Sequence, residues 1–153
     1  MIEFDPQTVT WALTRGKGVI EGEAFLKTRG GDVKTCAGSE VSLIPDSPYA
    51  RARMQLLYAS EEKGLLAPRP SLAQLRPADP DYARARFKAT CDAQGHFKFM
   101  RLAAGRYYVV TDVIWSVPTR DWGSRYSMEP QGGNLMLRVD VSEDDPQTVI
   151  LTY

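Results

Sequence analysis

Short runs of alternating apolar and polar residues, separated by turns rich in glycine and proline, are the feature that most constrains this chain. In residues 18–28 (GVIEGEAFLKT), Ile20, Ala24 and Leu26 fall on one side of an extended chain and charged residues fall on the other. The same alternation recurs in SEVSLIP (39–45), NLMLRVDVS (134–142) and QTVILTY (147–153). Such a pattern predicts half-buried β-strands rather than amphipathic helices.

Three further segments fix the expected order of the strands. Residues 82–100 contain an alternating run and a turn at Gly95, so we expect one hairpin there. Residues 103–115 are rich in β-branched and aromatic residues and predict a central strand, whereas 118–133 predicts a long loop. The whole chain, 1–153, therefore predicts a single all-β domain, an antiparallel Greek-key sandwich of seven or eight strands.

The stretch 46–80, called the insert below, differs from the rest of the chain. Five prolines interrupt it, and its second half predicts a loop. Residues 49–64 contain helix formers before a glycine, which favours a short helix, and a strand that continues through Leu57 is the alternative. Because the entropy of loop closure rises slowly with loop length, we expect the insert to be a peripheral excursion.

Three segments carry a family resemblance: GEAFLK (22–27), CAGSEVSLIP (36–45) and TCDAQGHFKFMRLAAGRYYVV (90–110). The residues of the last segment that match the family pattern in order are Asp92, Gly95, Phe97, Phe99, Leu102, Gly105 and Tyr107. The chain thus resembles the carboxypeptidase regulatory-like domain, a transthyretin-like sandwich, although its insert is longer than that family's connection. The resemblance implies a non-catalytic binding or structural module, which we expect in the bacterial cell envelope.

Two other function classes stay open, a carbohydrate-binding module and a transthyretin-like hydrolase. The hydrolases share the sandwich, and SRYS (124–127) is similar to their terminal motif. That enzyme class needs several histidines and a motif at the end of the chain, whereas His96 is the single histidine here. With no second histidine and no cysteine pair at zinc spacing, we expect no metal site and no cofactor.

The pentapeptide YARAR occurs twice, at 49–53 and at 82–86. Its four arginines are Arg51, Arg53, Arg84 and Arg86. We expect them to form one basic patch, because the two copies lie at the two ends of the insert. The patch is either a solvated surface or a site for an anion or polyanion, since guanidinium groups bind carboxylate and phosphate oxygens bidentately.

Aromatic residues near the predicted loop 118–133 form a second candidate site. Trp122 and Tyr126 offer large contact areas at little entropic cost, so they predict a platform for a sugar or a protein partner. Packing of the loop against the sandwich is the alternative role. Trp115 is the weaker candidate, because it ends an apolar strand.

The two cysteines, Cys36 and Cys91, lie near strand ends in the expected topology. They predict a disulfide, with a pair of buried free thiols as the alternative. A disulfide implies the periplasm or the cell surface, whereas free thiols favour the cytoplasm. Residues 1–11 lack the apolar core of a signal peptide, so an exported protein requires a leader, or a lipid anchor, upstream of residue 1.

Charge and hydropathy narrow the choice of partners. The 19 basic and 19 acidic residues cancel, so no overall field attracts nucleic acid. No apolar run approaches the roughly 18 residues of a transmembrane span. We therefore expect a protein or polysaccharide of the cell envelope as partner. The predicted core comprises Leu26, Val41, Leu43, Phe97, Phe99, Tyr107, Val109 and Val139.

Overall fold

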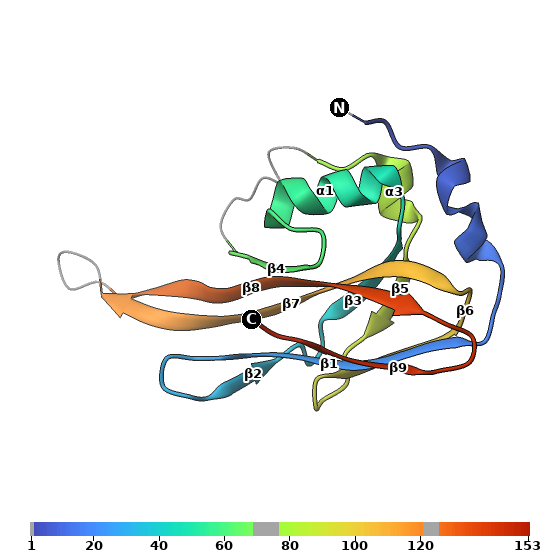
Figure 1. Ribbon diagram of the computed structural model, residues 1–153. Helices are drawn as coiled ribbons and strands as arrows, with labels where there is room; N and C mark the ends of the chain where they lie inside the picture. Colours follow the sequence, from blue (N-terminus) through green and yellow to red (C-terminus); the bar gives the residue numbers. More distant parts are fainter. Residues whose placement is uncertain (1, 69–76, 121–125) are drawn as a thin grey trace.

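Two packed β-sheets form the body of the molecule (Figure 1). The computed structural model describes residues 2–68, 77–120 and 126–153. The smaller sheet consists of β1 (Gly18–Lys27), β2 (Val33–Thr35), β6 (His96–Leu102) and β9 (Gln147–Leu151). The larger sheet, in spatial order, consists of β4 (Lys63–Leu66), β8 (Tyr126–Val141), β7 (Gly105–Arg120), β3 (Glu40–Pro45) and β5 (Phe87–Thr90).

Strand pairing confirms the predicted all-β sandwich, with nine strands among the described residues. Every neighbouring pair in the larger sheet is antiparallel, and β1 pairs antiparallel with β2 and β6. The pairing of β9 with β1 is parallel. The chain crosses between the sheets from β5 to β6, from β6 to β7 and from β8 to β9, whereas β7 and β8 are consecutive partners in the larger sheet.

The core between the sheets is built from the inward-facing residues that alternation predicted. All eight predicted core residues are buried, and Val41, Leu43, Tyr107 and Val109 are fully buried. Burial of a large apolar side chain stabilises a fold by about 1.5–3 kcal/mol, so these strands are fixed mainly by their apolar faces.

The prediction of one hairpin over 82–100 is wrong. β5 pairs with β3 and β6 pairs with β1, so the segment crosses from one sheet to the other. Its tight turn is present, with Gly95 at a φ of +80°. The first part is not a strand but the short helix α3 (Pro80–Arg84), because Asp79 caps it and a proline occupies its first turn.

The prediction of a loop over 118–133 is also wrong. β7 and β8 pair from Gly105–Val141 out to Arg120–Tyr126, so they form one long hairpin. Gly132 lies inside β8 with a φ of +87°, and an added Cβ there would lie 2.1 Å from the carbonyl oxygen of Val113. The glycine that suggested a loop therefore permits a close approach of two paired strands.

The insert contains the predicted helix, α1 (Pro48–Tyr58), which covers the outer face of the larger sheet (Figure 1). Ser47 begins the helix, because its side chain accepts a hydrogen bond of 3.0 Å from the Ala50 backbone N–H. Ala50 and Met54 are buried at 0% and 2% exposure. They join an outer apolar cluster whose other members are Phe4, Val9, Tyr82, Tyr108 and Met136.

The expectation of a peripheral insert is therefore wrong. Besides α1, the insert supplies β4, whose residues Lys63–Leu66 pair with β8 at the edge of the larger sheet. A 3-10 helix, η1 (Pro6–Leu13), precedes β1 and supplies Val9 to the same outer cluster. No helix among the described residues is long and apolar enough to cross a membrane.

The predicted disulfide joins Cys36 to Cys91, with an S–S distance of 2.07 Å. Cys36 directly follows β2 of the smaller sheet, and Cys91 directly follows β5 of the larger sheet. Both cysteines are buried, and the bridge closes a sequence separation of 55 residues. The disulfide thus ties the two sheets together beside the turn that contains Gly95.

Candidate functional site

A cleft opens where two hairpins project from the same end of the sandwich. Figure 1 shows the β7–β8 hairpin extending beyond the core and the β1–β2 hairpin lying across from it, with the C-terminus between them. The cleft has a volume of about 780 Å³, within the size range of small-ligand sites. Its lining residues are Leu26–Gly30, Leu65, Trp115, Val117, Thr119, Glu129, Gln131, Gly132 and Tyr153.

Side chains along β7 alternate between the two faces of the sheet, and Trp115 lies on the face that points toward the core. It reaches the cleft because β7 extends beyond the core. Val113, two residues earlier, is fully buried, whereas Trp115 is half-buried and Ile114 between them is exposed on the opposite face. An added Cβ at Gly132 would lie 2.6 Å from Cζ3 of Trp115. The indole ring thus packs against β8 at Gly132, where the partner strand has no side chain.

Polar side chains surround the indole on both sides of the cleft. Gln131 is the register partner of Trp115, and Glu129 is that of Val117, so both lie on the same face of the hairpin. Across the cleft, Thr28 closes the β1–β2 turn, because its backbone N–H donates to the Asp32 carbonyl at 2.8 Å. The arrangement offers an aromatic face together with amide, carboxylate and hydroxyl groups that can exchange hydrogen bonds with a polyol.

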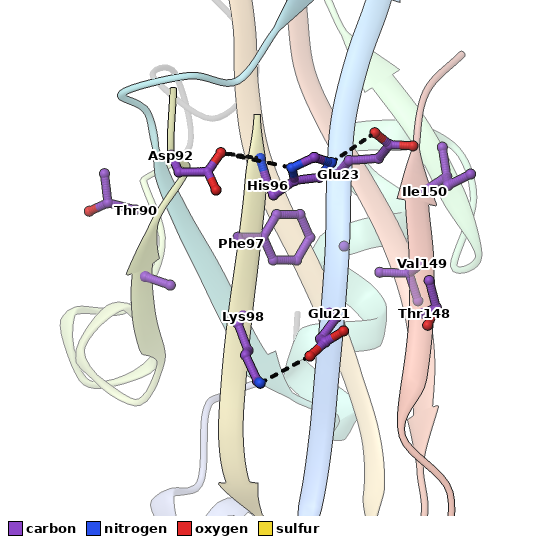
Figure 2. A pocket seen from close by; sticks show the side chains of 12 residues that line it. Glu21, Glu23, Thr90, Asp92, His96, Phe97, Lys98, Thr148, Val149 and Ile150 are labelled. Carbon is purple, nitrogen blue, oxygen red and sulfur yellow. Dashed lines mark hydrogen bonds and ion pairs between the residues drawn. The ribbon is translucent and has the colours of Figure 1, made fainter. Parts of the chain in front are cut away.

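A second hollow, of about 630 Å³, lies on the outer face of the smaller sheet (Figure 2). There Nζ of Lys98 lies 3.0 Å from Oε1 of Glu21, and Nε2 of His96 lies 3.3 Å from Oε2 of Glu23. Phe97 is the one aromatic residue among the described lining residues, and it is buried at 5% exposure. The charged groups of this hollow pair with one another, and it presents no aromatic face to a ligand.

Asp92 and His96 in the second hollow have a structural role in the turn. The Asp92 carboxylate accepts hydrogen bonds from the backbone N–H groups of Gln94 and His96, at 2.9 and 3.0 Å. The hydrogen bond from the His96 N–H, with the one from Gln94, lowers the pKa of Asp92 below its usual value of 3.8. No group of three or more potential metal ligands occurs among the residues that the structure describes.

The two YARAR copies lie side by side. The first copy lies in the first half of α1, and the second begins within α3 and ends two residues after it. The rings of Tyr49 and Tyr82 are 4.8 Å apart, and Phe4 packs against both. Arg53 and Arg86, the last arginine of each copy, line one groove beneath α1.

The other two predicted arginines are engaged elsewhere. Nη1 of Arg51 lies 2.8 Å from Oδ2 of Asp46, and Arg84 pairs with Asp81 within α3. The groove beneath α1 is therefore lined by Arg53 and Arg86, whereas Arg51 and Arg84 lie outside it; Arg86 also pairs with an acid, Glu40.

The predicted aromatic site is only partly described. Trp122 lies outside the described residues, and for Tyr126 the structure gives the backbone pairing with Arg120. The sequence favours Trp122 and Tyr126 over Trp115, and its patterns do not point to Gln131, Glu129 or Tyr153. The signal that identifies Trp115 is the phase of its strand, because Trp115, Val117 and Thr119 continue the inward positions of Val109, Thr111 and Val113.

Comparisons with known proteins show a clear likeness in structure. No protein-family model matches the chain, and no curated protein is significantly similar to it in sequence. A crystal structure of a "putative carbohydrate binding protein" from Pseudomonas aeruginosa matches with a TM-score of 0.79 and 25% sequence identity. The match covers 100% of this chain and 99% of that one, so the two proteins share the whole arrangement of strands.

Proposed function

We propose that this protein is a non-catalytic carbohydrate-binding module whose site is the cleft around Trp115. The observation that carries the proposal is the half-buried Trp115, which lines an open cleft together with polar residues from both hairpins. The apolar face of a sugar ring packs on an aromatic ring, while its hydroxyl groups exchange hydrogen bonds with planar polar side chains. The likeness to the Pseudomonas aeruginosa protein supports the same class of ligand.

The proposed setting is the bacterial cell envelope, with an envelope polysaccharide as partner. The Cys36–Cys91 disulfide supports an oxidising compartment, because such bridges are rare in the cytoplasm. The resemblance to the carboxypeptidase regulatory-like domain stays a prediction, and it agrees with a binding module that accompanies other domains. Thiol titration of unreduced, unfolded protein isolated from its native cells tests the compartment, and two free thiols per chain would contradict it.

A glycan array followed by calorimetry tests the proposed ligand class. We expect the wild-type protein to retain at least one oligosaccharide, and Trp115→Ala to weaken its binding at least tenfold. Gln131→Ala should also weaken binding, and this exposed residue can change without loss of packing. Ile114→Ala is the matched control, because Ile114 is the neighbouring residue on the opposite face of β7.

Two results would contradict the proposal. One is the absence of any retained glycan for a folded wild-type protein. The other is a retained glycan whose affinity is the same for the wild type, Trp115→Ala and Gln131→Ala.

A further inference from the structure

A separate groove lies beneath α1, on the outer face of the larger sheet. It has a volume of about 510 Å³, and it is bounded by α1, α3 and the strands β3, β7 and β8. Its apolar lining includes Ile44, Met54, Leu57, Val110 and Ile114. Ile114 is 48% exposed, so part of this apolar surface faces solvent. The groove is on the opposite side of the sheet from the cleft around Trp115.

Two guanidinium groups come to this groove from different elements. Arg53 lies on α1, whereas Arg86 lies just before β5, where its Nη1 is 3.1 Å from Oε1 of Glu40 and also donates to Ser42. The Nε of Arg86 is buried and has no hydrogen-bond partner among the described residues. An unsatisfied buried donor is costly, so this nitrogen favours an acceptor brought by a ligand.

Tyr82 lines the groove together with both arginines. Burial raises the pKa of the Tyr82 phenol above its usual range, and the positive charges of Arg53 and Arg86 act in the opposite direction. At the other end, the hydroxyl of Tyr58 hydrogen-bonds to Asn134, and Nδ2 of Asn134 donates to Asp112 at 2.8 Å. The groove thus has a cationic region beside Tyr82 and, beside Asn134, a hydrogen-bonded polar end that includes the Asp112 carboxylate.

We propose that this groove binds an amphipathic monocarboxylate, a small acid with an aromatic or alkyl body. The apolar body lies on the exposed surface that includes Leu57 and Ile114, and the carboxylate accepts hydrogen bonds from Arg53 and Arg86. A single negative charge fits best, because Glu40 pairs with Arg86 and Asp112 also lines the groove. A dianion or a polyanion would meet these carboxylates with a larger repulsion.

Calorimetry with 4-phenylbutyrate as the probe tests the proposal on the full chain. We expect saturable binding that is at least tenfold tighter than that of the neutral 4-phenylbutyramide. The double variant Arg53→Gln, Arg86→Gln should lose at least tenfold in affinity, whereas Lys88→Gln, an exposed cation outside the groove, should leave it unchanged. Trp115→Ala should also leave it unchanged, which separates this site from the carbohydrate cleft.

Ile114→Glu provides a second variant if loss of the Arg86 contacts unfolds the protein. It places a carboxylate on an exposed position of the groove, so it should weaken 4-phenylbutyrate binding at least tenfold. Equal affinity for the acid and the amide, or no saturable binding of the acid, would overturn the proposal. Tighter binding of phenyl phosphate than of 4-phenylbutyrate would overturn the assignment to a monocarboxylate.

Discussion

At the scale of single residues, the candidate cleft depends on the pair formed by Trp115 and Gly132. The indole lies where β8 lacks a side chain, and the same glycine adopts a positive φ that other residues rarely adopt. Trp115, at the end of an apolar run of β7, thereby becomes a side chain that lines the cleft. The cleft thus depends on two features: the alternation along β7 that places Trp115 on the inner face, and Gly132 on β8, which leaves room for the indole.

Substitution of Gly132 tests this local geometry. Gly132→Ala should lower the free energy of unfolding by more than Gly38→Ala, although both glycines have positive φ values, +87° and +80°. At Gly38 an added Cβ meets nothing within 4 Å, so that change costs about 1–2 kcal/mol for the left-handed conformation alone. At Gly132 the Cβ also meets the Val113 carbonyl. Chemical denaturation of the two variants makes the comparison, and equal losses would contradict it.

The carboxylate of Asp92 gives a pH dependence with a defined sign. Its pKa is lower in the folded protein than in the unfolded chain, so it stabilises the fold above pH 3.8, and this contribution is lost as the pH falls through the folded-state value. We expect an NMR titration midpoint for Asp92 below 3.8. Asp92→Asn should reduce the loss of stability between about pH 5 and pH 2. A midpoint at or above 3.8 would show that the turn does not hold the carboxylate.

At the scale of elements, the sequence predicted the strands and the helix whose patterns lie within a single segment. Alternation located β1 and β3, and helix formers located α1, whose observed cap is Ser47. The prediction of a hairpin over 82–100 failed because β5 pairs with β3 and β6 pairs with β1, which are far away in the sequence. The choice of pairing partner depends on which faces are buried in the assembled sandwich. The sequence of a single segment does not contain that information.

The long β7–β8 hairpin was missed because the prolines and glycines of 118–133 are typical of a loop. β7 pairs with β3 only through Tyr107–Thr111, and β8 pairs with β4 only through Asn134–Leu137. Toward the tip of the hairpin, past Thr111 on β7 and before Asn134 on β8, no described strand pairs with the outer edge of either strand. Pro118 and Pro130 lie there, where a missing N–H on an outer edge removes no ladder hydrogen bond. The candidate cleft was missed with the hairpin, because the hairpin forms one of its walls.

Removal of the insert tests its role as an element of the fold. We expect replacement of residues 46–80 by a short linker to prevent stable folding, because Tyr108 and Met136 would lose the cover that α1 provides. The milder change Met54→Ala should cost about 2–5 kcal/mol, since this side chain is buried at 2% exposure. Gln55→Ala, the next and exposed residue on α1, is the control. A shortened protein with wild-type stability would show that the outer cluster is dispensable.

At the scale of the whole molecule, two cores and one disulfide hold the sheets and helices together. The inner core lies between the sheets, and the outer cluster joins η1, α1 and α3 to the back of the larger sheet. The cleft around Trp115 opens at one end of the inner layer, and the groove that Arg53 and Arg86 line lies in the outer layer. The two proposed sites thus belong to different layers of the sandwich.

The disulfide should contribute strongly to the stability of the whole chain. Closing a loop of 55 residues stabilises a fold by about 4 kcal/mol on the chain-entropy model. The double variant Cys36→Ala, Cys91→Ala should therefore unfold at a lower urea concentration than the wild type. Addition of a reductant should produce a similar shift in the wild type and none in the double variant. A loss below about 1 kcal/mol would show that the bridge constrains the unfolded chain little.

The tryptophan indole signals in an NMR titration test the central claim most directly. The chain has three tryptophans, so three indole N–H signals can be followed while the best glycan from the array is added. We predict a saturable shift of the Trp115 signal and no shift of Trp11, which packs against Tyr107. A shift confined to Trp122 would instead support the aromatic site predicted from the sequence. Binding that leaves the Trp115 signal unchanged would contradict the assignment of the carbohydrate site to this cleft.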